Sequence, residues 1–359
     1  MDSRHTHREL GAVLLLTLMM LAVLAAIVIQ GMRSMQVNTA GAMVYRNGIQ
    51  ADALALSGVR MAQVLLNDDL VQSRETGTFT DTLLEDWARF PECEYFVPPD
   101  FATGQVALKI VDEQGKFPVN TVGSVGTTGD DSVKTLNLLV AAVLRAAGIS
   151  DDDSQELASQ VVWALKDWVD TGSDSSVELA EQDADYVNVE EDEGCRNAPL
   201  TNLREIFLVL ERIGLDEEVA SSLYLGKADV FPGLRDLLTL NDLEGININT
   251  AHPFVLQALA RDVDEDVAVS LAQAMDTYRR DPWNRDQLAA SDWYRDLAVE
   301  GSAFVTFPGA VTKSSWFSAQ ATGTVGAISR TVQASMHREG QSDPQKGIGK
   351  NVKILRIAF

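Results

Sequence analysis

The longest apolar run of the chain lies near its N-terminus. Residues 12–29 read AVLLLTLMMLAVLAAIVI, eighteen residues of which Thr17 is the only polar one. A helix of this length rises about 27 Å, close to the ~30 Å hydrocarbon core of a bilayer. Because no second run of this kind occurs, the sequence predicts at most one membrane span.

Apolar residues keep a helical spacing well beyond this run, as far as about Leu70, and no proline occurs between Ala12 and Val71. The pattern predicts one continuous helix of roughly 58 residues, about 87 Å long. A helix of that length exceeds what a single domain can bury. We therefore expect its amphipathic part to pack on a globular head and its apolar part to lie in lipid or against other helices.

The rest of the chain changes from strand to helix patterns and back. One strand is predicted at 106–111, followed by a turn at 112–115 and an extended segment at 116–122. Helical periodicity then dominates from Leu136 to about Leu297. Four further strands are predicted at 303–307, 316–324, 328–337 and 352–358, with a hairpin turn near Gly323–Gly326. This order predicts an α+β fold: a long helix on a small antiparallel sheet, with a large all-α insertion.

Composition and charge narrow the function. The 359 residues carry 29 Lys and Arg against 52 Asp and Glu, a net charge of −23, which disfavours nucleic-acid binding. The apolar share of 46% is that of a globular protein, and two cysteines are too few for a disulfide scaffold or a four-thiolate metal site. Of four histidines, only His252 and His337 lie outside the first eleven residues, and no nucleotide-binding motif is present. The sequence therefore predicts that the protein is not an enzyme.

Three interpretations of the N-terminus compete: a cleaved secretory signal, a plain signal anchor, and a prepilin-type signal that is cut before the apolar run. The third fits a glycine placed directly ahead of the run, because Gly11 precedes Ala12 and a basic leader precedes Gly11. Glycine lets the backbone enter a protease site in an extended form. The apolar run would then stay in the mature protein and continue into the long helix.

A retained apolar stretch at the start of a long helix on a globular head is the design of pilins, and the sequence resembles that class closely. Most pilins carry Glu at the fifth position after the cut, where this chain has Leu16. A carboxylate in an apolar helix is normally paired with the free amine of the subunit above it. In lacking it, the chain resembles the general secretion pathway protein K family, the minor pseudopilins of type II secretion.

The resemblance implies a division of the chain into a leader, a membrane-spanning half-helix, the first part of a head, a helical insertion and the C-terminal strands of the head, at 1–11, 12–29, 30–122, 123–298 and 299–359. It implies cleavage after Gly11 by the prepilin peptidase and methylation of the new N-terminus at Ala12. The expected place is the bacterial inner membrane, with the head in the periplasm.

The resemblance also implies a role and partners. We expect a subunit at the tip of the pseudopilus that starts assembly and supports export of folded proteins across the outer membrane. Its partners would be minor pseudopilins I, J and H and major pseudopilin G, with secreted substrates also in reach of the tip. A minor pilin of a type IV pilus and a single-pass periplasmic receptor are the alternative functions.

One motif lies within the predicted insertion. Residues 245–259, GININTAHPFVLQAL, resemble an NxNTA signature of the family, and 118–121, PVNT, resemble it more weakly. We expect Asn249 or Thr250 to cap the helix that follows. The same signature occurs in helix-hairpin-helix DNA-binding modules, but the segment after Leu259 carries four carboxylates and no glycine. A structural helix cap is therefore the favoured interpretation.

Acidic residues concentrate in one part of the insertion: fifteen against one basic residue between Asp151 and Glu193. A hard cation with oxygen ligands relieves such repulsion, and a solvated acidic loop is the alternative. The family has a DW[LIV]D motif followed by an acidic stretch that binds calcium. The resemblance implies that the calcium ligands here are Asp167, Asp170, Glu181, Asp183 and Asp185.

The two cysteines, Cys93 and Cys195, lie about a hundred residues apart in sequence. In an oxidising periplasm they would tend to form a disulfide, which would tie the acidic loop to the head. Two unpaired cysteines are the alternative, and the sequence does not decide between them.

Overall fold

The structure, a computed structural model, describes residues 3–89, 103–170, 197–339 and 351–358, with the side chains of the first helix described from Val13 onward. The helices are α1 (Ser3–Thr76), α2 (Asp86–Arg89), α3 (Thr127–Ala146), α4 (Asp151–Val169), α5 (Arg204–Arg212), α6 (Glu217–Leu225), α7 (Leu234–Leu237), α8 (Pro253–Leu259) and α9 (Glu265–Arg280). The strands are β1 (Gln105–Asp112), β2 (Phe117–Pro118), β3 (Gly226–Lys227), β4 (Phe231–Pro232), β5 (Leu238–Thr239), β6 (Ile246–Asn247), β7 (Ala310–Val311), β8 (Trp316–Val325), β9 (Ile328–Arg338) and β10 (Val352–Ala358).

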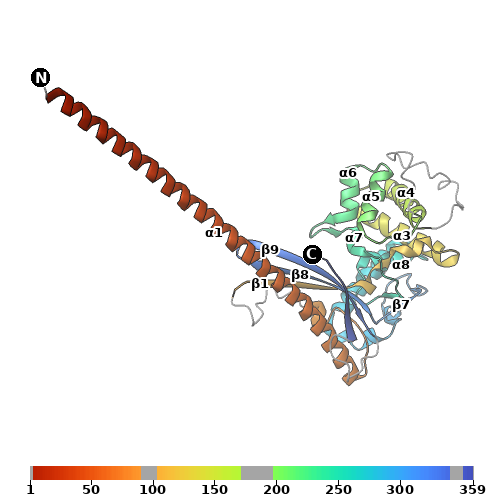
Figure 1. Cartoon of the computed structure of the whole chain (residues 1–359). Helices are drawn as coiled ribbons and strands as arrows, with labels where there is room; N and C mark the ends of the chain where they lie inside the picture. Colours follow the sequence, from red (N-terminus) through yellow and green to blue (C-terminus); the bar gives the residue numbers. More distant parts are fainter. Residues whose placement is uncertain (1–2, 90–102, 171–196, 340–350, 359) are drawn as a thin grey trace.

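The predicted long helix is confirmed. Helix α1 has 74 residues, and its N-terminal half projects away from the rest of the molecule (Figure 1). It runs six residues past the predicted end at Leu70 and stops before Gly77, whose φ of 74° is a left-handed conformation typical of a helix C-terminus. From Ala51 to Leu70 one face of the helix is buried at spacings of three and four residues, which is the amphipathic half that the sequence predicts.

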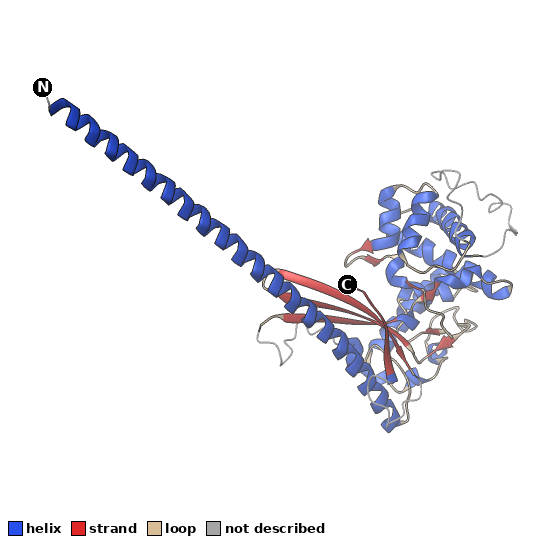
Figure 2. Cartoon of the chain, in the orientation of Figure 1, coloured by secondary structure: helices blue, strands red, loops and turns tan. Residues whose placement is uncertain are grey.

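That buried face packs on a four-stranded antiparallel sheet, with the strand order β1-β8-β9-β10 (Figure 2). The C-terminal half of α1 and this sheet are called the head below. Alternate residues of β1 turn toward the helix, so Val106, Leu108 and Ile110 are buried. The strands predicted at 106–111, 316–324, 328–337 and 352–358 are all present. The two-residue turn between β8 and β9 contains Gly326, with φ of 60°.

Two predicted extended segments are wrong. Residues 303–307 form turns and no strand, although Val305 and Phe307 are buried in the core of the insertion. Of 116–122, only Phe117–Pro118 is a strand, and a 3₁₀ helix (Val119–Gly123) follows it. In both segments the buried apolar residues pack in the core of the insertion, and an extended pattern in sequence therefore does not require a full strand.

Glycine sets how closely α1 approaches the sheet. A Cβ atom on Gly323 of β8 would lie 2.1 Å from the carbonyl oxygen of Ala51, and one on Gly58 would lie 2.7 Å from Cβ of Ala321. Neither distance is compatible with a side chain. Two glycines, one on each surface, therefore allow direct backbone packing of the helix on the sheet. At the other end of the interface the rings of Trp87 and Phe317 pack edge to face, 5.3 Å apart.

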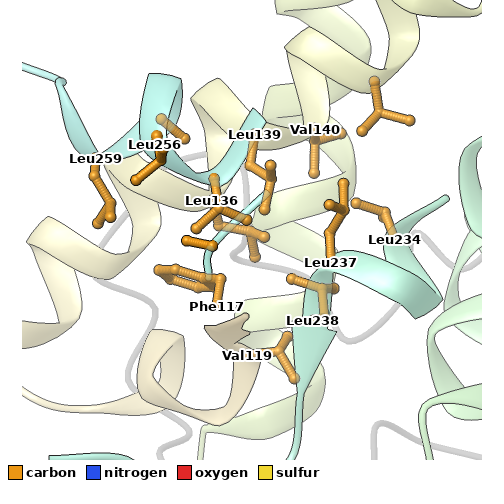
Figure 3. Packing of buried hydrophobic residues seen from close by; sticks show 14 of the residues in the cluster. Phe117, Val119, Leu136, Leu139, Val140, Leu234, Leu237, Leu238, Leu256 and Leu259 are labelled. Carbon is orange, nitrogen blue, oxygen red and sulfur yellow. The ribbon is translucent and has the colours of Figure 1, made fainter. Parts of the chain in front are cut away.

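The chain leaves the head after β1 and returns before β8, and between these strands it forms a helical block with its own hydrophobic core. This block lies at the end of the molecule opposite to the N-terminus (Figure 1). Figure 3 shows part of the core, in which side chains of α3, α7 and α8 surround Phe117 of β2. The block is the all-α insertion that the sequence predicts, and is called the insertion below.

Short parallel strand pairs lie where the chain enters and leaves the insertion. Strand β2 pairs with β5, and β6 pairs with β7, so that Asn247 lies opposite Val311. A further backbone bond joins Asp81 N–H to the carbonyl of Thr312, at 2.8 Å. These pairings bring the segment GININT against the end of β1 and the start of β8. They define a joint between the head and the insertion.

Candidate functional site

The first candidate site is the exposed apolar half of α1. Gly11 and Ala12, the predicted cleavage residues, lie within the helical backbone of α1. Leu16 is 63% exposed, and its apolar neighbours as far as Ile29 are similarly exposed. Among the described residues, one helix is long and apolar enough to cross a membrane, and no residue of its most apolar window is buried. Such a surface is stable only when lipid or other chains cover it.

The predicted calcium ligands are only partly within the described residues. Asp167 lies in the last turn of α4, and Asp170 follows that helix, where its backbone N–H donates to the carbonyl of Lys166 at 2.8 Å. The other three, Glu181, Asp183 and Asp185, lie outside the described residues, as do both cysteines of the predicted disulfide, Cys93 and Cys195. The calcium site and the disulfide therefore remain predictions.

The expected helix cap at Asn249 or Thr250 is wrong. The N-cap of α8 is His252, whose Nδ1 accepts from the backbone N–H of Phe254 at 3.2 Å. Burial is the main cause that lowers the pKa of His252 to about 4, so the ring is neutral and can accept this bond. Asn249 instead bonds the carbonyl of Leu288 and the indole N–H of Trp293. Asn249 of the motif therefore forms hydrogen bonds inside the insertion, and the helix cap is His252, which follows the motif.

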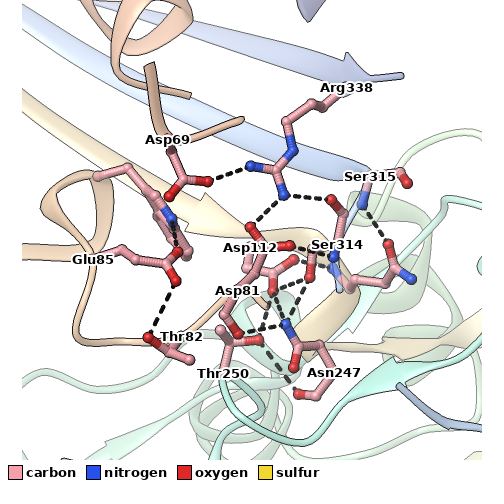
Figure 4. Close-up of polar contacts among 12 residues, drawn as sticks. Asp69, Asp81, Thr82, Glu85, Asp112, Asn247, Thr250, Ser314, Ser315 and Arg338 are labelled. Atoms are coloured by element: carbon pink, nitrogen blue, oxygen red, sulfur yellow. Dashed lines mark hydrogen bonds and ion pairs between the residues drawn. The ribbon is translucent and has the colours of Figure 1, made fainter. Parts of the chain in front are cut away.

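Asn247, the first polar residue of the motif, connects three parts of the chain. It is fully buried, and its side-chain amide donates to the carbonyl of Asp81 at 3.2 Å, to Oδ2 of Asp112 at 3.1 Å and to Oγ of Ser314 at 2.8 Å. The hydroxyl of Thr250 also donates to Oδ2 of Asp112, at 2.6 Å. Figure 4 shows these groups converging from the head and the insertion. Asp112 of the head therefore accepts hydrogen bonds from two side chains of the insertion.

The neighbouring cluster holds three more carboxylates and one cation. Arg338, at the end of β9, donates from Nη1 to Asp69 at 2.6 Å and from Nη2 to both Asp81 and the carbonyl of Ser314 (Figure 4). Glu85 lies beside them, since carboxylate oxygens of Asp69, Asp81 and Glu85 come within 4.8 Å of one another. A group of carboxylates this close requires positive charge or protons. Here Arg338 supplies the positive charge for Asp69 and Asp81.

Burial dominates the acid–base behaviour of this cluster. It raises the pKa of Glu85 to about 9, to which the charges of Asp69 and Asp81 add, so Glu85 is protonated at neutral pH. Burial also raises the pKa of Asp69 to about 6 against the opposing effect of Arg338, and it raises the pKa of Asp112 to about 6 against the hydrogen bonds from Ser314 and Thr250. Asp69 and Asp112 therefore gain or lose a proton near pH 6, and Glu85 does so well above neutral pH.

The sequence does not predict this cluster. It predicts a turn at 112–115, and Asp112, the last residue of β1, caps a 3₁₀ turn there by accepting from the N–H of Gln114 at 2.8 Å. The other members, Asp69, Asp81, Glu85 and Arg338, come from segments far apart in a chain with 52 acidic residues. No local pattern distinguishes four buried carboxylates from so many exposed ones. The one local signal is the repeated Asn in GININT, whose position suggests a helix cap.

The structure defines the class of protein: it has a pilin-like fold, in which a long, half-exposed N-terminal helix packs on a small antiparallel sheet that carries a helical insertion. Comparisons agree with this class. One chain of the crystal structure of the GspK–GspI–GspJ complex from the type 2 secretion system of enterotoxigenic Escherichia coli matches with a TM-score of 0.56 at 19% identity, over 89% of this chain and 98% of that chain.

Sequence comparison points to a particular family. The type II secretion system protein K of Pseudomonas aeruginosa is 27% identical over 226 residues, which are 63% of this chain and 60% of that protein. The match thus spans less than two thirds of this relative. No protein-family model matches the sequence. The sequence match and the shared fold together support assignment of the chain to the type II secretion protein K family, as the sequence predicts.

Proposed function

We propose that this protein is a minor pseudopilin of type II secretion, which takes the tip position of the pseudopilus and starts its assembly. The proposal rests on one observation: the N-terminal half of α1 is apolar and exposed, and its C-terminal half packs on a pilin-like sheet. A surface of this kind is suited to lipid before assembly and to neighbouring helices afterwards. The protein acts in this proposal as an assembly subunit, with no catalytic step.

Two features favour the tip. Leu16 replaces the carboxylate that would pair with the amine of a subunit above, so α1 offers no charged partner to such a subunit. The insertion adds a second hydrophobic core at the end of the molecule opposite to the N-terminus (Figure 1). Its bulk would obstruct a further subunit there. Both features are consistent with a subunit that has neighbours below it along the filament axis and none above it.

The proposed setting follows from the same helix. The leader ends at Gly11, is removed by the prepilin peptidase, and leaves Ala12 as a methylated N-terminus in the inner membrane, with the head in the periplasm. Minor pseudopilins I and J, together with H and the major pseudopilin G, would cover α1 beyond the membrane. Secreted proteins would meet the insertion at the apex.

The test is assembly of the full chain, co-expressed with the prepilin peptidase and pseudopilins I and J and purified in detergent. Met35 is 73% exposed on α1 beyond the apolar run, so Met35→Glu should reduce recovery of the complex at least tenfold. Phe304 is 94% exposed on the insertion, so Phe304→Glu is the matched control and should leave recovery unchanged. Equal recovery with both variants would contradict assembly through α1.

N-terminal sequencing of the purified protein separates the alternatives. A mature chain that starts at Ala12 is expected. An intact Met1 would favour a single-pass receptor, and a cut after Gln30 would favour a secreted protein. Replacement Leu16→Glu, followed by separate assays of secretion and of pilus formation, distinguishes type II secretion from a type IV pilus: loss of secretion alone is expected.

We also propose that the acidic part of the insertion binds calcium. Asp167 and Asp170 lie three residues apart at the C-terminus of α4, where the negative end of the helix dipole disfavours carboxylates. A hard cation would offset that charge, and carboxylate oxygens are the donors that calcium prefers. Glu181, Asp183 and Asp185 would complete the set, as the family resemblance implies.

Thermal melting of the full chain in detergent tests this proposal. Millimolar calcium should raise the melting temperature of the wild type and of Asp152→Asn, a control at the opposite end of α4 where Asp152 is exposed. The variant Asp170→Asn should lose most of that rise. An unchanged melting temperature of the wild type with calcium would refute the site without affecting the proposed assembly role.

A further inference from the structure

Asp112 occupies an unusual electrostatic position in the joint. It is 6% exposed, and its Oδ2 accepts three bonds, from Asn247 and Thr250 on the insertion side and from Ser314 at the start of β8. All three donors are neutral. The carboxylate at the centre of the joint is therefore held by dipoles alone, with no cation among its hydrogen-bond partners in the described part of the chain.

The charges around Asp112 are engaged elsewhere. From the head, Arg338 donates to Asp69 and Asp81. From the insertion, Arg285 adds a weaker attraction to Asp69. Glu85 adds a further acidic group behind Asp81. Beside Asp112 on the chain, Glu113 is paired with Lys116 at 2.6 Å. From the insertion, Arg279 is paired with Asp276 and donates to the carbonyl of Ile248. Asp81 is the charge that most affects Asp112 directly, and it is repulsive.

We propose that Asp112 is a proton-sensitive clasp between the head and the insertion: the protonated carboxyl favours the closed joint, and the ionised carboxylate favours a joint that opens to water. Opening would separate Asn247 and Thr250 from Asp112 and allow water to solvate the carboxylate. The closed joint excludes that water, because Asn247 is fully buried and Gly115 lies so close to Thr250 that a Cβ there would be 2.8 Å from its hydroxyl.

The direction follows from linkage between proton binding and closure. Burial raises the pKa of Asp112 from 3.8 to about 6 in the closed joint, whereas a hydrated carboxylate in an open joint keeps its ordinary pKa. Closing therefore takes up a proton between these two values. The ratio of closed to open joints should fall as the pH rises from about 4 to about 6, by up to about 100-fold, and stay constant above.

Hydrogen exchange of the full chain in detergent measures this ratio. The backbone N–H groups of Ile246 and Ile248 donate to the carbonyls of Gly309 and Val311, so they report directly on the joint. Exchange is followed by mass spectrometry from pH 4 to pH 8 and is corrected with the rate of a disordered peptide at each pH. Protection of the segment 246–251 should fall by 10-fold to 100-fold between pH 4 and pH 6 and then remain level.

Three variants make the result specific. Asp112→Asn is neutral at every pH and should keep constant protection. Thr250→Val removes a donor that lowers the pKa of Asp112, so the fall should extend to higher pH. Asp68→Asn changes an exposed carboxylate of α1 and should reproduce the wild type. If Asp112→Asn does not fold, the shift in Thr250→Val remains decisive. Protection that does not change with pH in the wild type, or an unshifted fall in Thr250→Val, would overturn the proposal.

Discussion

Replacing Arg338 by Met tests whether one guanidinium neutralises the buried carboxylates of the head. The substitution removes two ion pairs and the bond to the carbonyl of Ser314, and it keeps an unbranched chain over the ring of Phe317, on which Arg338 packs at 4.7 Å. Removing one partner of a buried pair leaves an uncompensated charge and costs about 3–5 kcal/mol. We expect a loss of that size in the free energy of unfolding of the head at pH 8.

The loss should depend on pH, with a sign that follows from Asp69. Its pKa is about 6 even with Arg338 beside it, and removing the cation raises it further. At pH 5 the variant can therefore protonate Asp69 in the folded state and relieve the repulsion from Asp81, whereas at pH 8 it cannot do so at low cost. Each pH unit is worth about 1.4 kcal/mol per proton, so the loss at pH 5 should be smaller by about 1–2 kcal/mol.

The assay is urea unfolding of the full chain in detergent at pH 5 and pH 8, followed by circular dichroism. Arg330→Met is the matched control on the same strand, because Arg330 is 57% exposed and lies 3.8 Å from Asp52; it should cost less than about 1 kcal/mol. Adding Asp81→Asn to Arg338→Met should restore part of the stability at pH 8. An equal loss at both pH values, or a loss no larger than that of the control, would refute the electrostatic account.

Two further predictions concern the head. Glu85→Gln should increase the free energy of unfolding by about 1–2 kcal/mol at pH 8 and by less at pH 5. The reason is that folded wild-type Glu85, with a pKa of about 9, must hold a proton that the unfolded chain releases above about pH 4.5. Exposed Glu75→Gln is the control, and equal urea midpoints for Glu85→Gln and the wild type at pH 8 would contradict this prediction. Gly323→Ala should destabilise the head by about 1–3 kcal/mol, because the new Cβ would lie 2.1 Å from the carbonyl oxygen of Ala51. Thr322→Ala is the control for a change to alanine on the face of β8 away from α1, where it removes only the bond between the hydroxyls of Thr322 and Thr331. The melting temperature of Gly323→Ala should be lower than that of the control by several degrees.

The sequence predicted those parts of the fold that depend on local periodicity. A helical repeat without proline from Ala12 to Val71 has few alternatives, and the structure shows one continuous helix there. Alternation in 106–111 identified β1 for the same reason, since every second residue contacts α1. Periodicity is ambiguous in short segments. Residues 303–307 read AFVTF, a composition typical of a strand, yet Val305 and Phe307 are buried in the core of the insertion without strand structure.

The joint was not predictable because its chemistry depends on long-range contacts. Asn247 and Asp112 are 135 residues apart in sequence, and Arg338 and Asp69 are 269 apart. Thr250 has a residue type and a position that suit a helix cap, but its hydroxyl is used by Asp112, and His252 can cap because burial keeps it neutral. Local sequence rules thus predict a hydrogen-bonding role for Thr250 but give it the wrong partner, the backbone of α8 in place of Asp112.

The position of the joint explains why it needs side-chain bonds at all. Strands β1 and β8 are neighbours in the sheet, and the insertion is connected to the head through the end of one and the start of the other. Two adjacent connections alone would act as a hinge, about which the insertion could rotate. Asn247 bonds Asp112 and Ser314 at the two connections, and it also bonds the carbonyl of Asp81, which follows α1 and belongs to neither connection. These bonds resist rotation, so the protonation state of Asp112 acts where the orientation of the insertion on the long helix is set.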